Sequence, residues 1–325
     1  MMKKIFILSI IFCSLGLSEV IAQGCSDAGF CTMGAMQPAQ IYTKKINFKL
    51  KSIEFGQNFS KTTTSPNILI TFVDFNFGVT EKSSFQIKVP FQYATGNLGS
   101  TAGMGDISFS YTQNLKSSET YHINGTVGFK VPLGKGDNQD SDPVLTGGRS
   151  VDLPMYYQPN LGTFDFVAGA SYLTQKWLFA AGIQIPLIQN NENDWRKTDF
   201  LPPLGNYPSP AYLDNYDPAN NLERGIDVMV RAQRSWNFSR WDLYVGLLPI
   251  FRISKDEITD TETGERVKLD GTTGLALTAL ASTAYNFNTT SAIKFLGGFK
   301  LAERDVNPDG LTRESVFTLS YIKRF

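Results

Sequence analysis

Apolar and polar residues alternate along most of the chain, as in strands that have one apolar and one polar face. The stretch 121–133 shows this best, because one face collects Tyr121, Ile123, Val127, Phe129, Val131 and Leu133. Its other face contains His122, Asn124, Thr126, Lys130 and Pro132. The same period recurs at 83–93 and 241–252. Beyond residue 22 we find no apolar run long enough for a spanning helix, so the pattern favours β-strands.

Applied to the whole chain, the alternation predicts about twelve strands near the length of a tilted membrane strand, roughly 9–11 residues. We place them at 42–55, 66–79, 82–94, 104–115, 121–133, 162–175, 177–188, 225–237, 240–253, 273–287, 290–302 and 314–325. The predicted fold class is all-β: a transmembrane, antiparallel, up-and-down β-barrel over 41–325, with a small N-terminal plug. Fourteen strands stay possible, since 189–224 could hold one more hairpin, although its many prolines argue against it.

The predicted connections alternate in length. The odd-numbered ones are long and rich in Gly, Pro, Asn and Asp: 56–65, 95–103, 134–161, 189–224, 254–272 and 303–313. The even-numbered ones are tight, as at 80–81, 237–240 and 288–289. Tight turns on one side and long loops on the other are typical of outer-membrane barrels, whose long loops are extracellular.

The first residues predict export. Lys3 and Lys4 precede an apolar run at 5–17, and 20–22 reads Val-Ile-Ala, so we expect a signal peptide at 1–22 with cleavage after Ala22. A membrane anchor is the alternative, but the run is shorter than the about 20 residues that a spanning helix needs. A lipoprotein cleaved before Cys25 is a second alternative, although the usual Leu of that motif is missing.

The segment 23–40 contains the cysteines that remain after cleavage, Cys25 and Cys31. Two thiols in an exported chain usually pair, so we expect a disulfide in this plug or periplasmic segment. Its short loop makes the bond worth about 2 kcal/mol on the chain-entropy model. A metal or redox pair is the alternative, but neither a His nor a third Cys lies nearby in the sequence.

Charged residues gather on the polar faces of the predicted strands, and the alternation turns these faces toward the lumen. The lumen-facing candidates are Lys49, Asp74, Lys88, Asp106, His122, Lys130, Asp165, Asp227, Arg231, Asp242 and Arg252. One interpretation is mutual neutralisation across a narrow lumen that also holds the plug. The other is a polar conduit whose selectivity depends on Lys88, Lys130 and Arg231.

Four prolines fall near the outer ends of upward strands: Pro90, Pro132, Pro186 and Pro249. Proline cannot donate to the sheet ladder, so it belongs at strand ends, bulges or edges. The structural interpretation is that these prolines end strands at the rim. The functional one is that missing ladder bonds weaken the wall and let an apolar solute leave sideways into the lipid.

The last strand alternates apolar residues and ends in an aromatic one, through Phe317, Leu319, Tyr321 and Phe325. This pattern resembles the signal that outer-membrane assembly machinery recognises, which makes that machinery an expected partner. Lys323 departs from it, and a lysine there could snorkel to the interface.

The composition excludes several function classes. With 30 basic and 30 acidic residues the net charge is zero, whereas a nucleic-acid binder usually has a basic surplus. His122 is the single histidine, and no nucleophile stands at a recognisable spacing from it. We therefore expect no enzyme, no cofactor and no metal site.

Some segments resemble a known family. The strand–Pro–Gly rhythm at 131–134, the strand start at 105–107 and the stretch 161–166 look like outer-membrane proteins of the phenol-degradation meta-pathway group, relatives of the long-chain fatty-acid transporters. The resemblance runs loosely over 85–190, and the Phe-rich strands and Cys pair also look like barrels of the Bacteroidota. It implies a plugged barrel that takes up hydrophobic small molecules, but 24–38 does not match the hatch motif of the fatty-acid transporters.

We therefore expect a passive transport protein for small hydrophobic molecules in the outer membrane of a Gram-negative bacterium. Membrane lipid and a hydrophobic ligand would be its other partners. The long loops, mainly 134–161 and 189–224, would offer an apolar surface to the solute. The alternative is a non-transporting barrel that acts as an anchor, adhesin or assembly component through these loops.

Overall fold

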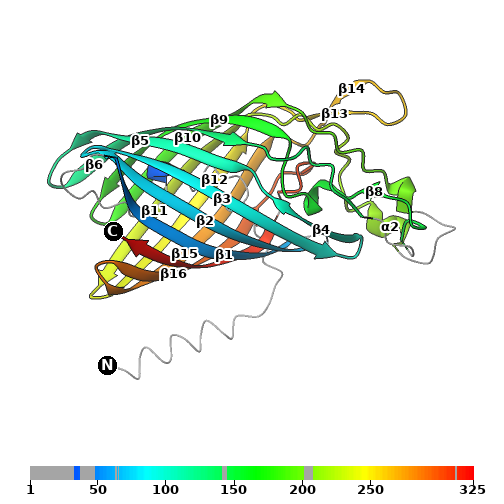
Figure 1. Ribbon diagram of the computed structural model, residues 1–325. Coiled ribbons are helices and arrows are strands. Elements are labelled where there is room, and N and C mark those ends of the chain that lie inside the picture. The colour runs from blue at the N-terminus through cyan, green and yellow to red at the C-terminus, as the bar shows by residue number, and fades with distance from the viewer. Residues whose placement is uncertain are drawn as a thin grey trace.

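The fold is a closed β-barrel (Figure 1). The computed structural model describes residues 33–36, 48–62, 64, 66–140, 145–200, 208–311 and 313–325. Within them, twelve antiparallel strands form the wall, so the predicted number is confirmed. These strands are β1 (Lys49–Thr62), β2 (Asn67–Thr80), β3 (Ser83–Gly96), β5 (Ile107–Ser117), β6 (Tyr121–Val131), β9 (Thr163–Thr174), β10 (Trp177–Gln189), β11 (Asp227–Phe238), β12 (Trp241–Arg252), β15 (Gly274–Asn288), β16 (Ser291–Ala302) and β17 (Arg313–Arg324).

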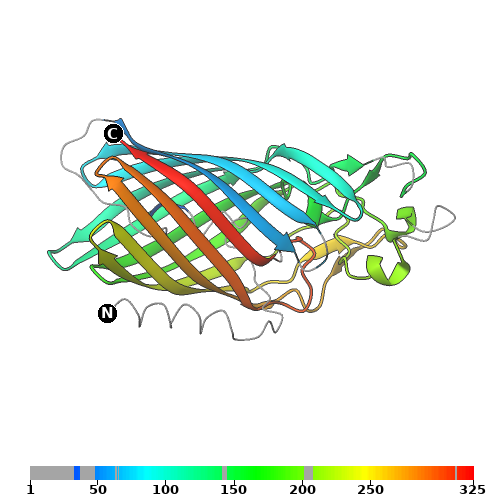
Figure 2. The same cartoon turned by 90° about the horizontal axis from the view of Figure 1, so that it is seen from below.

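Each strand pairs with its neighbours in sequence, and β1 pairs with β17 to close the ring. The closing register runs from Ser52 opposite Arg324 to Thr62 opposite Arg313. Figure 2 shows β1 in blue beside β17 in red. Closure leaves the wall without a free edge, so the backbone donors and acceptors of the strands find partners within the barrel.

Large apolar side chains cover the outside of the barrel. On β12, Val245 and Leu247 are 47% and 46% exposed, whereas Leu248 next to them is fully buried. Phe129 on β6 is also exposed, and its ring stacks on the neighbouring Phe164. An exposed apolar band around a closed barrel is the surface that a lipid bilayer covers. Among the described residues, no helix combines the length and the apolar character that crossing a membrane requires.

The first strand lies further along the chain than predicted. We expected a strand at 42–55 and a loop at 56–65, but β1 continues to Thr62 and the connection to β2 is short. Phe55 and Phe59 are exposed here, while Asn58 and Ser60, on either side of Phe59, are buried inside. A strand with small polar residues on its inner face resembles a loop in sequence, and this caused the error.

The prediction for the second long connection is also wrong. The predicted loop 95–103 contains a tight turn at Asn97–Leu98 and the short strand β4 (Gly99–Met104), which pairs with the outer half of β3. Gly105 and Asp106 alone separate β4 from β5. The register of β3 shifts by one residue across them, from Phe91 opposite Met104 to Lys88 opposite Ser108. This shift is a β-bulge, so β3, β4 and β5 form one long hairpin that extends beyond the rim.

The described parts of the remaining long connections 132–162, 190–226, 253–273 and 303–312 lie at one end of the barrel, and we call them the loop cap (Figure 1). Their short elements are β7 (Gln139–Asp140), β8 (Val151–Asp152), η3 (Met155–Tyr157), η4 (Lys197–Phe200), α2 (Pro210–Leu213), β13 (Glu257–Thr259) and β14 (Arg266–Lys268). The described part of 190–226 thus holds two short helices and no extra barrel hairpin.

Apolar residues of the loop cap are buried against each other. Tyr156, Tyr157, Trp195, Leu213 and Tyr216 form one cluster with residues of β2 and of the β3–β4 hairpin. Our expectation of an exposed apolar loop surface is therefore wrong for these residues. They form a small core of their own at the mouth of the barrel.

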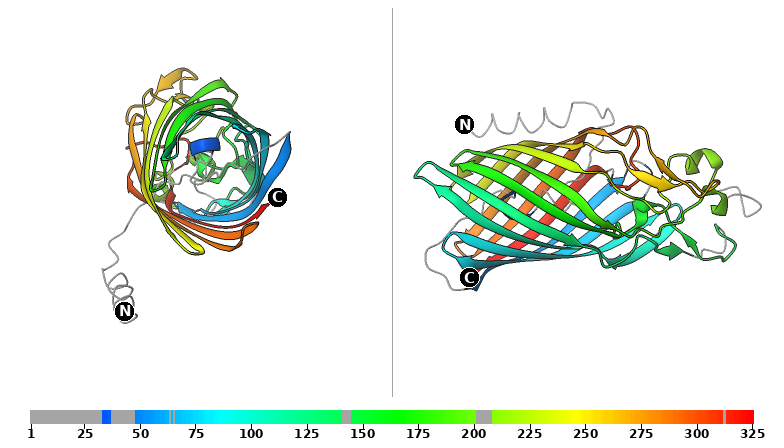
Figure 3. Two further views of the ribbon diagram at one scale, coloured as in Figure 1. Left: turned by 90° about the vertical axis from the view of Figure 1, so that its left-hand side faces the viewer. Right: turned by 90° about the horizontal axis from the view of Figure 1, so that it is seen from above.

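Several predictions lie outside the described residues. These are the signal peptide at 1–22, the cysteines Cys25 and Cys31, and most of the segment 23–40. From that segment the structure describes residues 33–36, which include the 3₁₀ helix η2 (Gly34–Met36). Figure 3 shows η2 inside the ring of strands, seen along the barrel.

Candidate functional site

Polar and apolar contacts hold η2 inside the barrel. The N–H of Gly34 donates to Gln86 Oε1 at 2.7 Å, and Arg231 donates to the carbonyl of Met36 at 3.2 Å. Gly34 has a φ of +50°, and a Cβ there would overlap Thr112 Oγ1, so this approach to the wall requires glycine. The side chains of Met33 and Met36 pack in an apolar interior patch formed by Val167, Ala180, Met229, Leu248 and Leu280.

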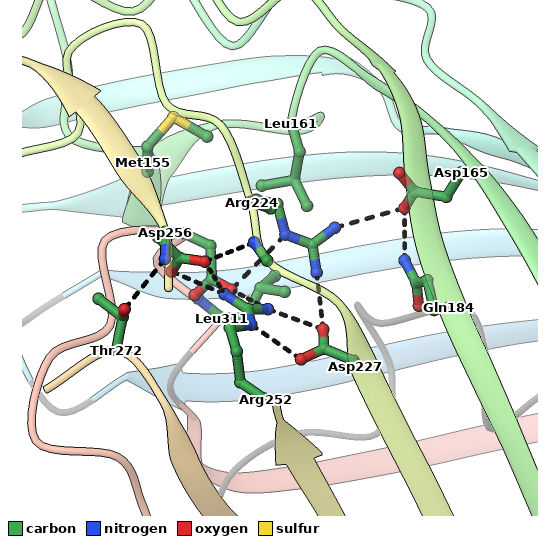
Figure 4. A network of polar contacts seen from close by, with 12 residues as sticks. Met155, Leu161, Asp165, Gln184, Arg224, Asp227, Arg252, Asp256, Thr272 and Leu311 are labelled. Atoms are coloured by element: carbon green, nitrogen blue, oxygen red, sulfur yellow. Dashed lines mark hydrogen bonds and ion pairs between the residues drawn. The ribbon is translucent and has the colours of Figure 1, made fainter. Parts of the chain in front are cut away.

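A network of buried ion pairs lies between the barrel and the loop cap (Figure 4). It joins three arginines to four aspartates: Arg224, Arg252, Arg304, Asp165, Asp227, Asp256 and Asp309. Arg252 lies at its centre, at 2.7 Å from Asp227, 2.8 Å from Asp256 and 3.0 Å from Asp309. All seven side chains are almost fully buried.

This network connects segments that are far apart in sequence. Arg224 lies in the connection 190–226 and contacts Asp165 on β9 at 3.3 Å, while Arg304 and Asp309 belong to the connection 303–312. Burial by itself raises the pKa of Asp309, but the three surrounding guanidinium groups hold it well below its ordinary value. Asp309 is therefore ionised inside the protein and pins the loop cap to the barrel.

A cavity of about 70 Å³ lies inside the barrel, between β1–β6 and the loop cap. It is lined by Asn58, Ile70, Phe72, Lys88, Pro90, Gln92, Gly105, Asp106, Ser108, Lys130, Met155, Gln158, Pro159, Asn160, Leu161, Asp309, Leu311 and Arg313. Lys130 pairs with Asp106 at 2.8 Å, and the ammonium group of Lys88 lies 4.4 Å from the centre of the Phe72 ring. The cavity thus has charged and polar walls beside an apolar one.

The structure divides the predicted lumen-facing residues into groups. Lys88, Asp106 and Lys130 line the cavity. Asp165, Asp227 and Arg252 belong to the ion-pair network. Two candidates belong to neither group: Arg231 contacts η2, and Asp74 accepts from Gln86 Nε2 at 2.5 Å.

Three more of these candidates lie near the opposite end of the barrel. His122 is the second residue of β6, near the turn, and its Nδ1 lies 3.0 Å from Ser117 Oγ. Asp242 accepts from Asn237 beside the β11–β12 turn. Lys49 is exposed at the start of β1. None of these three lines the cavity.

Sequence reasoning missed Arg224, Asp256, Arg304, Asp309 and the polar loop residue Asn160. All five lie in connections that we had interpreted as exposed loops. A usable signal was the position of Arg224 three residues before Asp227, and of Asp256 four residues after Arg252. Charges spaced in this way at strand ends can form ion pairs across the rim.

The four prolines coincide with strand ends or irregular pairing. Pro132 directly follows β6. Pro90 accepts from the N–H of Gly105 at the bulge between β4 and β5, and Pro186 lies at a register shift between β9 and β10. In the β11–β12 ladder, residues 230–231 of β11 have no paired residue on β12, and Pro249 lies opposite this gap. The expectation that these prolines end strands holds for Pro132 alone, because β3, β10 and β12 continue beyond Pro90, Pro186 and Pro249.

The apolar residues of the last strand lie on the outer surface. Leu319, Tyr321 and Phe325 are exposed, and Phe317 packs against Phe295 and Phe299. The ammonium group of Lys323 lies 3.4 Å from Thr290 Oγ1, beside the β15–β16 turn. Recognition of this strand by assembly machinery stays a prediction.

Comparison with known proteins finds likeness in solved structures. An outer membrane channel from Pseudomonas putida F1 shares 13% identity at a TM-score of 0.55, over 89% of this chain and 99% of that one. The two proteins share the fold of a closed β-barrel. The NanC porin (6% identity, TM-score 0.44, 84% and 100% covered) and the CymD monoaromatic hydrocarbon channel (10%, 0.39, 95% and 99%) are more distant.

No protein-family model and no curated protein matches the chain. At such low identity, the likeness to the Pseudomonas channel shows a common barrel fold. The resemblance to the phenol-degradation group and the Bacteroidota lineage stay predictions.

Proposed function

We propose that this protein is a passive channel for small, mainly hydrophobic molecules in the outer membrane of a Gram-negative bacterium. The cavity inside the closed barrel, directly beneath the loop cap, is the observation that supports this most. A barrel that served only as an anchor would not need an internal cavity beside its mouth. The apolar outer band supports a membrane location, with lipid as a partner.

The cavity supports a solute with an apolar body. One part of its wall consists of Ile70, Phe72, Met155, Leu161 and Leu311. In this proposal the solute enters through the loop cap, rests in the cavity and passes η2 on its way down the lumen. The charged groups around the cavity are largely paired with each other. They therefore keep the cavity in shape and add little unfavourable free energy to the passage of an uncharged solute.

We further propose that the segment around η2 is the plug. It lies within the ring of strands, and its two methionines occupy the interior apolar patch. Methionine is flexible and fills irregular space without specific hydrogen bonds, which suits a segment that must yield to a passing solute.

The experiment measures ion conductance in planar bilayers for the full chain and for a variant that lacks residues 24–38. We expect the deletion to raise single-channel conductance, because it removes η2 from the lumen. The double variant Met33→Ser, Met36→Ser should open more often than the unmodified chain, since its plug loses apolar contacts. A Met104→Ser variant, changed outside the lumen, is the matched control.

Equal conductance of the deletion variant and the full chain would contradict the plug. If neither conducts ions nor takes up hydrophobic solutes into liposomes, the channel proposal fails. The alternative of an anchor or adhesin, which the folded loop cap would suit, then becomes the better explanation.

A further inference from the structure

A guanidinium group lies on the apolar outer surface of the wall. Arg231 and Gln233 point into the lumen, where Arg231 Nε donates to Gln233 Oε1 at 3.0 Å. Successive side chains of a strand alternate in direction, so Arg234 points outward. Its guanidinium carbon lies 5.2 Å from the ring centre of Trp177 on the neighbouring β10 and 5.3 Å from that of Trp236. The two indole rings thus hold the cation by cation–π attraction.

Within the described part of the chain, Arg234 has no anionic partner. No carboxylate there forms an ion pair with it, and no acceptor atom takes a hydrogen bond from it. Its Nε is enclosed, whereas the two terminal Nη groups are not. The outward neighbours Leu243 and Val245 on β12 are exposed and apolar. An unpaired charge beside lipid is costly, and the surrounding membrane is where these Nη groups can find an acceptor.

The position of Arg234 along the wall places it near the lipid headgroups. It stands four residues before Phe238, the last residue of β11, at the end of the barrel away from the loop cap (Figure 1). Trp241 pairs with Phe238 across the turn and is exposed, as is Trp177. Tryptophan gathers where a bilayer meets water, and a long basic side chain near that level extends toward the phosphates.

The turns next to Arg234 add positive charge. The carbonyl of Lys176 in the β9–β10 turn accepts from the N–H of Ser235 at 2.8 Å, so this turn lies beside Arg234. Arg240 lies in the β11–β12 turn. Among the described residues, neither Lys176 nor Arg240 has a carboxylate partner. Asp242, two residues after Arg240, instead accepts from asparagine side chains. Clustered basic groups attract anionic lipid more than zwitterionic lipid.

We propose that Trp177, Arg234 and Trp236 bind the phosphate group of an anionic phospholipid of the phosphatidylglycerol type, in the leaflet on the turn side of the barrel. The two Nη groups donate to two phosphate oxygens, the paired geometry that arginine favours. The acyl chains lie on the apolar side chains of Leu243 and Val245. The site rests on the membrane location in the proposed function and does not depend on conduction.

Native mass spectrometry of the detergent-solubilised full chain tests this site. Phosphatidylglycerol and phosphatidylcholine with identical acyl chains are added in equal amounts, and the fraction of protein ions that retains each lipid is measured. We expect the protein to retain more phosphatidylglycerol than phosphatidylcholine. Equal retention of the two lipids would overturn the proposal.

Variants of Arg234 locate the binding. Arg234→Gln should weaken retention of phosphatidylglycerol about tenfold, as expected for the loss of one charge-assisted hydrogen bond. Arg234→Lys keeps the charge but loses the paired donors, so its retention should lie between that of Arg234→Gln and that of the unmodified protein.

Lys323→Gln is the matched control, because it removes one charge at the same end of the barrel. The ammonium group of Lys323 already contacts the hydroxyl oxygens of Thr290 and Ser291. This variant should retain phosphatidylglycerol as the unmodified protein does. Similar losses in Arg234→Gln and Lys323→Gln would show attraction by the overall surface charge and would contradict the site.

A competition experiment separates lipid from free phosphate. Excess inorganic phosphate should leave bound phosphatidylglycerol in place, because it has no acyl chains to contact the wall. Displacement of the lipid by inorganic phosphate would mean a site for a free anion and would refute a lipid site. Heat-dependent gel mobility checks that Arg234→Gln is folded, and if it is not, retention by Arg234→Lys equal to that of the unmodified protein would count against the paired donors.

The outcome for the site is separate from the outcome for the channel. Conductance without a preference for phosphatidylglycerol would remove the site and leave the channel. Phosphatidylglycerol binding that depends on Arg234, without conductance or uptake, would remove the channel and leave a lipid-binding barrel.

Discussion

Asp309 is the carboxylate on which the buried ion-pair network depends most. It lies 3.7 Å from Arg224, 3.0 Å from Arg252 and 3.3 Å from Arg304. Its pKa is lowered in the folded protein, because the attraction of the guanidinium groups exceeds the effect of burial. The stabilisation from Asp309 is therefore present above the unfolded pKa of an aspartate, about 3.9, and is lost as pH falls toward the lower folded value.

The neighbouring Asp256 shifts in the opposite direction. Burial raises its pKa, and the attraction of Arg252 only partly offsets this. Its contribution is greatest below the unfolded pKa and declines as pH rises through the folded one. The two aspartates thus have different roles, and Asp309 is the one that favours a closed loop cap at neutral pH.

We predict that Asp309→Asn lowers the free energy of unfolding at neutral pH by about 3–5 kcal/mol, because it leaves buried arginines without their shared partner. Thermal unfolding in detergent and hydrogen exchange of 303–311 would measure this. Asp214→Asn, which breaks an exposed pair with Lys197, should change little. Equal effects of the two substitutions would contradict the role of Asp309.

At the scale of elements, prolines mark where pairing in the wall is interrupted. The β11–β12 ladder pairs Met229 with Ile250 and Ala232 with Leu247, and omits the residues between them, where Pro249 lies. Leu248 in that gap belongs to the same buried apolar cluster as Met33 and Met36, and Arg231 donates to the carbonyl of Met36. The interrupted stretch of wall is thus also the one that η2 contacts.

We predict that Pro249→Val completes this ladder and stabilises the barrel by about 1 kcal/mol, the net value of one hydrogen bond. Amide exchange at Val230 and Arg231 should slow. If solute leaves through this gap, uptake should fall as well. Pro132→Val, beyond the end of β6, is the control and should leave amide exchange in β11 as it is; no slowing in Pro249→Val would argue against a proline-made gap.

Alternation predicted most strands because the outward-facing side chains, such as Phe129 and Val245, are apolar, so that apolar residues recur at every second position. It failed at β1 and β4, where Gln57, Asn58 and Gly99 resemble loop residues. Side chains on the inner face can be polar, charged or small, so residues there do not follow a clear sequence pattern. The ion-pair network and the cavity could not be predicted, because they join Asp106, Arg224 and Asp309, whose contacts depend on how the loops fold.

At the scale of the whole molecule, the apolar band would set the position of the proposed channel in the bilayer. Leu247 is near the middle of β12, whereas Leu133 lies beyond the end of β6 at the rim. The two leucines are similarly exposed, at 46% and 50%. They differ in their expected depth in the bilayer, which makes them a matched pair.

We predict that Leu247→Arg destabilises the bilayer-embedded barrel by about 2–4 kcal/mol, as a cation near the midplane does, and that Leu133→Arg costs about 0–1 kcal/mol. Urea titration of folding into liposomes would measure both. A similar cost at both positions would show that the band does not face lipid as we infer.

The seam between β1 and β17 bears on how the molecule is made. Ser320 on β17 donates to Glu54 on β1 across 266 positions of sequence. No part of β1 can find this partner until nearly all of the polypeptide has been synthesised. Until then the edge of β1 that will face β17 has unpaired backbone N–H and C=O groups, which promote aggregation with other chains. We therefore expect the pairing of β1 with β17 to form last, and we predict that the nascent protein needs a chaperone that keeps it apart from other copies.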